Sequence, residues 1–164
     1  MPDAETRWLS ADEQQAWRTF LTACHTLFGA VDGQLLRDSD IPHGYYEILV
    51  RLSEAPGRAL RMTQLAEAST SSKSRLSHAV ARMQERGWVQ RTDCATDRRG
   101  QVCQLTDKGM AVLAAAAPGH VDQVRRSLID RITPEQVEQL HAISQAIVTG
   151  ADRDSPTSPS SCPL

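Results

Sequence analysis

The 164-residue sequence lacks any long run of apolar residues. Its longest stretches without Asp, Glu, Lys or Arg are Thr19–Val31 and Gly109–Val121, and both are shorter than the roughly 20 residues that a membrane-spanning helix requires. The first residues also lack a secretory signal, because Asp3 and Glu5 are acidic and no apolar segment follows them directly. We therefore expect a cytoplasmic protein with no membrane partner.

The sequence is equally poor in signatures of catalysis and metal binding. It contains no phosphate-binding loop, no dinucleotide-binding glycine pattern, no HExxH and no GxSxG. The histidines never stand at ligand spacing with a second histidine or cysteine, and the cysteines form no CxxC pair. We expect no enzyme, no cofactor and no metal site, and thiols rather than disulfides. The cysteines are Cys24, Cys94, Cys103 and Cys162.

Positive charge is not in excess overall, since 18 Lys and Arg oppose 20 Asp and Glu for a net charge of −2. Taken alone, this balance argues against a nucleic-acid-binding protein. The distribution along the chain reverses that conclusion. Between Arg58 and Lys108 ten basic residues accompany five acidic ones, a net of +5, which leaves −7 on the rest of the chain. A basic segment of this kind offers contacts to phosphate groups.

The N-terminal part of the chain has helical periodicity. Ser10-Ala11-Asp12-Glu13 is a capping box, and apolar residues then recur every three or four positions. Pro42 suits the first position of a second helix that ends before Pro56-Gly57, and a short third helix is predicted over Thr63–Ala68. The apolar stripe of the first helix consists of Trp17, Phe20, Leu21, Cys24, Leu27, Phe28, Val31 and Leu35.

A fourth helix is predicted from an N-cap at Ser72 to a stop at Gly87. Its apolar face carries Leu76, Ala79, Val80 and Met83. Its opposite, polar face carries Ser74, Arg75, His78 and Arg82. Two strands then follow, at Trp88–Thr92 and Gln101–Leu105, which predict a hairpin with a basic tip.

Two more helices complete the pattern. The first begins after Thr106-Asp107 and is expected to be interrupted near Pro118-Gly119, and the last opens at Thr133-Pro134. The order of elements predicts a mainly α fold with a small β-hairpin wing, a winged helix-turn-helix with N- and C-terminal dimerisation helices. We divide the chain into a dimerisation helix (1–40), a winged helix-turn-helix DNA-binding domain (41–106), C-terminal dimerisation helices (107–149) and a disordered tail (150–164).

Short motifs at defined spacing accompany this pattern. They are Leu65-Ala66-Glu67, Ser72-x-Ser74-x-Leu76-Ser77, Arg82-Met83-x-Glu85-Arg86-Gly87-Trp88-Val89-x-Arg91, Asp97-Arg98-Arg99 and Leu105-Thr106-x-Lys108-Gly109. With them the sequence resembles the MarR family of bacterial winged-helix regulators, over residues 41–148. The resemblance implies a homodimer, built from the first helix and the last two, that binds a double-stranded pseudo-palindromic DNA operator. It implies a regulator of transcription, which we take to be a repressor released by a small-molecule effector.

The resemblance also implies which residues meet DNA. The fourth helix would lie in the major groove, and the wing arginines would reach a minor groove, braced by Asp97. Arg91 is either a phosphate contact or a structural residue, and His78 is either a phosphate contact or a solvated surface residue. The implied DNA-binding residues are Ser72, Lys73, Ser74, Arg75, Ser77, His78, Arg82, Arg91, Asp97, Arg98 and Arg99.

An effector site follows only from the resemblance. In this family ligands sit between the dimer helices and the winged domain. Here that region would be lined by Phe28, Tyr45, Tyr46 and Leu49, although the same residues also fit a plain core.

The cysteines leave a second interpretation open. Cys24 belongs to the apolar stripe and is interpreted as a buried, inert thiol. Cys94 and Cys103 stand symmetrically about the wing tip, where they could face each other across the strands and respond to oxidation. The alternatives to a ligand-released regulator are therefore a redox-responsive regulator, or a winged-helix protein-interaction module without an operator of its own.

Overall fold

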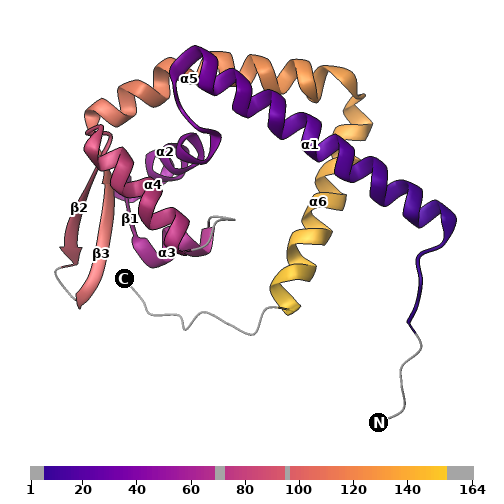
Figure 1. Ribbon diagram of the computed structural model, residues 1–164, viewed down its shortest axis with the longest axis horizontal. Helices are drawn as coiled ribbons and strands as arrows, with labels where there is room; N and C mark the ends of the chain where they lie inside the picture. Colours follow the sequence, from indigo (N-terminus) through magenta and orange to yellow (C-terminus); the bar gives the residue numbers. More distant parts are fainter. Residues whose placement is uncertain (1–5, 69–72, 95–96, 155–164) are drawn as a thin grey trace, which may run out of the picture. The chain divides into compact units, whose positions relative to one another are not determined.

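The computed structural model describes residues 6–68, 73–94 and 97–154. The chain divides into two compact units, one up to Val124 and one from Arg125. The first unit, shown in Figure 1, contains α1 (Ala11–Ser39), α2 (His43–Glu54), the 3₁₀ turn η1 (Pro56–Arg58), β1 (Ala59–Arg61), α3 (Met62–Ala68), α4 (Lys73–Glu85), β2 (Val89–Cys94), β3 (Asp97–Leu105) and most of α5 (Asp107–Ser127).

The predicted start of α1 is confirmed. The Ser10 hydroxyl accepts a hydrogen bond from the backbone N–H of Glu13, and the Glu13 carboxylate accepts one from the backbone N–H of Ser10. The next helix begins at His43 with Pro42 as its N-cap, one position outside the helix rather than in its first position. Because proline has no capping side chain, Asp32 of α1 takes that role and accepts the N–H of His43 at 2.9 Å.

Strands β1, β3 and β2 lie side by side in that order and are antiparallel. The two wing strands run further toward the tip than predicted, to Cys94 and from Asp97. This longer pairing sets Cys103 opposite Arg91 and Cys94 opposite Asp97. The expectation that Cys94 and Cys103 face each other is therefore wrong.

The core of this unit forms where α2, α3, α4 and the sheet meet. The predicted apolar face of α4 is confirmed, since Leu76, Val80 and Met83 are buried. The apolar stripe of α1 is covered only near its C-terminal end. Other residues of that stripe are exposed within the single chain, among them Trp17, Phe20 and Phe28, whereas Val31 and Leu35 are buried.

Helix α5 continues through Pro118-Gly119, so the expected interruption is wrong. Proline removes one N–H donor, yet the helix stays continuous here, and the residue after it packs closely against α1. A Cβ atom at residue 119 would lie 2.8 Å from Nε2 of the buried Gln34, so the glycine allows α5 to approach α1 closely.

The second unit contains the end of α5, the 3₁₀ turn η2 (Ile129–Arg131) and α6 (Pro134–Asp154). The predicted start of α6 is confirmed, because Thr133 and Gln136 exchange backbone-to-side-chain hydrogen bonds in a capping box. The helix runs past residue 150, where the tail was expected to begin, and its side chains Ile143, Ile147 and Val148 are exposed. Among the described residues no helix is long and apolar enough to cross a membrane.

Candidate nucleic-acid interface

The outer face of α4 is polar and exposed. Its inner face is held in the core by Leu76, Val80 and Met83, which fixes the rotation of the helix about its own axis. The side chains of the outer face are exposed along the whole helix: Lys73, Ser74, Arg75, Ser77, His78 and Arg82. Ser72, the predicted N-cap, lies outside the described residues. The structure thus presents hydrogen-bonding groups on one helix face, as groove recognition requires.

Arg82 and Glu85 form an ion pair of 3.1 Å on this exposed face. Residues three apart on a helix are surface neighbours, so the pair needs no other element to hold it. Both side chains are more than half exposed, and the Arg82 guanidinium therefore remains accessible from outside the molecule.

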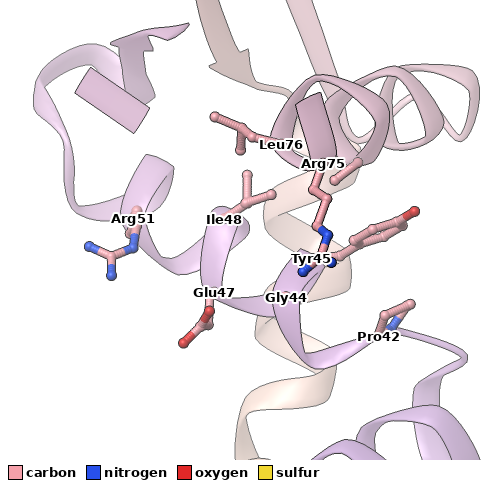
Figure 2. Close-up of a pocket in the computed structure, with 9 residues that line it drawn as sticks. Pro42, Gly44, Tyr45, Glu47, Ile48, Arg51, Arg75 and Leu76 are labelled. Carbon is pink, nitrogen blue, oxygen red and sulfur yellow. The ribbon is translucent and has the colours of Figure 1, made fainter. Parts of the chain in front are cut away.

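Arg75 lies at the border between α4 and α2. It lines a cavity of ≈200 Å³ whose walls come from both helices, and Figure 2 shows its guanidinium directed toward Tyr45. The apolar floor of this cavity is formed by Ile48, Leu76 and Ala79, and Glu47 and Arg51 stand on the α2 side. Arg75 therefore stands where a change in α2 or an occupant of the cavity would reach it.

Arg91 is tied to the chain itself. Its Nη2 donates a hydrogen bond of 2.9 Å to the backbone carbonyl of Ser77, so β2 is joined to the middle of α4. Its Nε is buried, and within the described part of the chain this atom has no hydrogen-bond partner. Of the two roles that the sequence left open for Arg91, this geometry favours the structural one.

The wing carries the remaining predicted residues. Asp97, Arg98 and Arg99 belong to β3, so the backbone of this motif is extended and forms one edge of the hairpin. Their side chains lie outside the described residues. In the wing, β3 pairs with β2, the strand that Arg91 ties to α4.

Two of the four residues predicted to line an effector site lie in different cavities of the described part of the chain. Tyr45 lines the cavity between α2 and α4, whereas Tyr46 lines another of ≈300 Å³ on the side of α2 that faces α5. Leu49 is fully buried in the core, and Phe28 is exposed. Adjacent residues of a helix point in directions about 100° apart, which is why Tyr45 and Tyr46 separate.

The second cavity contains an aromatic and imidazole cluster. The His120 ring lies 4.3 Å from the ring of Tyr46 and 6.2 Å from that of His43, measured between centroids. Burial lowers the pKa of His120, and the nearby His43 lowers it further. The sequence did not point to His120, because the cluster depends on α5 packing beside α2.

Two of the cysteines, and the residue types that could bind a metal, can be located in the structure. Burial raises the pKa of the Cys103 thiol to about 11, against the opposing effect of the Arg91 charge, so the thiol stays protonated and unreactive at neutral pH. Cys24 is half-buried on α1. Across the described ranges no group of three or more His, Cys, Asp or Glu side chains is arranged to hold a metal ion.

Comparisons with known proteins agree with this architecture. A family model described as the MarR family matches residues 39–100. The transcriptional regulator HosA of Escherichia coli O127:H6 is 34% identical over 99 residues, which cover 60% of this chain and 71% of HosA.

Two solved structures from Streptomyces coelicolor share the fold over most of the chain. One is Sco3205, described as a MarR family transcriptional regulator in complex with DNA, with a TM-score of 0.86 and 50% identity over 90% of this chain and 92% of that one. The other is AbsC, also described as a MarR family transcriptional regulator, with a TM-score of 0.84 and 40% identity over 90% and 99% of the two chains.

Proposed function

The chain belongs to the MarR family of transcriptional regulators, and from this premise we propose that it is a homodimeric, sequence-specific DNA-binding protein. In this proposal α4 is the recognition helix and enters the major groove, and the wing reaches a minor groove of a pseudo-palindromic operator. The observation that carries the proposal is the division of α4 into a buried apolar face and an exposed polar face with three basic residues, Lys73, Arg75 and Arg82.

Charge and similarity support the same assignment. The segment from Arg58 to Lys108, which contains α4 and the wing, carries a net charge of +5, although the whole chain is at −2. Phosphate contacts supply the sequence-independent part of DNA affinity. Sco3205, which shares half of its aligned residues with this chain, is described in complex with DNA. The DNA-facing residues of the proposal are those of the outer face of α4 and of the wing, with Arg91 as a support between them.

The exposed apolar residues support a homodimer. Trp17 and Phe20 on α1, and Ile147 and Val148 on α6, are large side chains that the single chain leaves in solvent. Apolar surface of this kind is buried in protein interfaces. A second copy of the chain, joined through the terminal helices, is the occupant that we propose, and two copies present two recognition helices to two half-sites.

Control of transcription follows from occupancy of the operator. We take the protein to act in the cytoplasm as a repressor that a small ligand releases from DNA. The cavity beside Arg75 supports ligand release, since an occupant there would engage a residue of the recognition helix.

The proposal is tested by selecting bound DNA from a random pool with the full chain. We expect enrichment of a pseudo-palindrome whose half-sites are centred about one helical turn, or 10 base pairs, apart. A pool that remains random after repeated rounds would contradict the proposal and favour a protein-interaction module instead.

A further inference from the structure

The C-terminal end of α4 is a junction of three parts of the chain, and Arg86 is its centre. Arg86 Nη1 donates a hydrogen bond of 2.9 Å to the backbone carbonyl of Asp40, and Nη2 lies 3.2 Å from the Asp40 carboxylate. The backbone carbonyl of Arg86 accepts a hydrogen bond of 2.7 Å from Nζ of Lys108. Asp40 caps α1 and Lys108 is in the first turn of α5, so one residue joins both helices to α4.

Neighbouring groups hold both Asp40 and the Arg86 guanidinium in place at this junction. Asp40 has a left-handed backbone with φ of 52°, and its N–H donates to the carbonyl of Leu36 at the end of α1. The Arg86 guanidinium lies over the ring of the buried Trp88, 4.9 Å from its centroid. A planar guanidinium that rests on an aromatic ring is pre-oriented for its hydrogen bonds, which lysine would not be.

The end of α4 is equally well defined. Gly87, with φ of 73°, closes the helix in a Schellman motif in which Gly87 donates to the carbonyl of Gln84 and Trp88 to that of Met83. Arg86 is therefore the last residue before a fixed turn. The backbone of Arg86, from which the guanidinium reaches Asp40, is thus part of a fixed helix end.

We propose that Arg86 is a positioning residue that sets the distance between the two recognition helices of the dimer. Through this distance it sets the length of the operator spacer, which is the set of base pairs between the two half-sites. This inference rests on the proposed function, in which α1 belongs to the dimer interface and α4 reads DNA. One added base pair moves a half-site by about 3.4 Å along the axis and turns it by roughly 34°. A protein rejects such an operator only if α4 is held firmly relative to α1, and the contact between Arg86 and Asp40 is a direct bridge between the two.

The test compares affinities of the full chain for the selected operator and for versions with one base pair added to or removed from the spacer. The variants are Arg86→Gln, which removes the bridge, and Asp40→Asn, which keeps the backbone carbonyl and a side chain that tolerates the left-handed conformation. The matched control is Arg58→Gln. Arg58 pairs with Asp107 at 3.1 Å and its side chain is 45% exposed, against 3.2 Å and 41% for Arg86 with Asp40, so the same charge and a similar ion pair are lost.

We expect Arg86→Gln to reduce the preference for the native spacer by about tenfold or more, which corresponds to roughly the specificity that one good base contact provides. Asp40→Asn should reduce it less, and Arg58→Gln should leave it unchanged. Affinity for unrelated DNA should fall equally in Arg86→Gln and Arg58→Gln, since each loses one positive charge.

An unchanged spacer preference in Arg86→Gln, or an equal loss in Arg58→Gln, would overturn the inference. If Arg86→Gln does not fold, Asp40→Asn decides the matter, and an unchanged preference in that variant would overturn the inference as well. A wild-type protein that binds no operator would contradict the proposed function itself, which distinguishes the two failures.

Discussion

Arg91 and Ser77 connect the wing to α4, the proposed recognition helix, through a hydrogen bond of 2.9 Å from the guanidinium of Arg91 to the backbone carbonyl of Ser77. The two residues are on different elements, β2 and α4, and the arginine is half-buried between them. The bond links β2 directly to the middle of α4. In the proposed complex the placement of the wing beside α4 decides whether both reach adjacent grooves together.

Replacement of this arginine should therefore affect stability before it affects DNA contacts. We expect Arg91→Gln to lower the free energy of unfolding by about 1–2 kcal/mol, because a charged group loses its hydrogen bond to a carbonyl. Chemical denaturation measures this loss. The matched control Arg82→Gln removes only an exposed pair within one helix and should cost about 0.5 kcal/mol or less. If Arg91→Gln keeps wild-type stability but reduces the salt dependence of DNA binding, Arg91 is a phosphate contact instead.

The wing arginines should act mainly through phosphate or minor-groove charge. Arg99→Ala is expected to weaken binding to all DNA sequences and to reduce the slope of log affinity against log salt by about one unit. Titrations at several salt concentrations measure the slope. Arg37→Ala, which removes an exposed charge from α1, serves as the control and should leave the slope as in the wild type. Equal slopes for wild type and Arg99→Ala would remove Arg99 from the interface.

The packing around Gly109 explains why the motif Leu105-Thr106-x-Lys108-Gly109 ends in glycine. Any Cβ at this position would collide with the backbone carbonyl of Trp88, and that carbonyl is held by hydrogen bonds from the backbone and hydroxyl of Thr106. Gly109→Ala should destabilise the fold by about 3 kcal/mol or more, since backbone must move.

Gly29→Ala is the matched control for Gly109→Ala. Gly29 is also inside a helix, but among the described residues nothing besides its chain neighbours and its own helix backbone lies within 4 Å of its Cβ position. This change should stabilise the chain by up to about 1 kcal/mol through helix propensity. Thermal unfolding of the two variants compares them directly, and a wild-type melting temperature for Gly109→Ala would contradict the packing described here.

His120 should make stability depend on pH. Burial lowers its pKa in the folded protein below the ordinary value of 6.5, so the unfolded chain takes up the proton first as pH falls. The stabilisation is fully present above about pH 6.5 and declines as pH falls toward the lower pKa of the folded state. We expect the free energy of unfolding of His120→Phe to fall less than that of the wild type across the ~2.5 pH units from about pH 7.5 to about pH 5.

The control for His120 is the same change at the exposed His141. Melting temperatures across this pH range should fall in parallel for His141→Phe and the wild type. A parallel fall for His120→Phe would show that His120 does not carry the pH dependence.

Features that depend on neighbouring residues were predictable from the sequence. The capping box of Ser10 and Glu13, the stop at Gly87 and the apolar face of α4 each involve residues within a few positions of one another, and all are confirmed. The family followed from motifs of the same local kind. Short-range spacing thus identified α4 as a helix with one buried apolar face.

Features that depend on distant packing were not predictable. Strand β1 has three residues, too few for a periodic signal, and exists because it pairs with β3 more than 40 positions later. Arg86 and Arg91 bond to backbone carbonyls, which every residue possesses, so no side-chain pattern marks their partners. The close approach of Gly119 to Gln34 of α1, within an α5 that runs on past Pro118, likewise has no local signal.

The central claim is that this chain binds a specific DNA sequence through the outer face of α4. The most direct test is the equilibrium affinity of the full chain for its selected operator and for a scrambled duplex of the same length and composition, at about 150 mM salt. The account predicts affinity for the operator that is higher by about 10³-fold or more. Equal affinity for the two duplexes would contradict it.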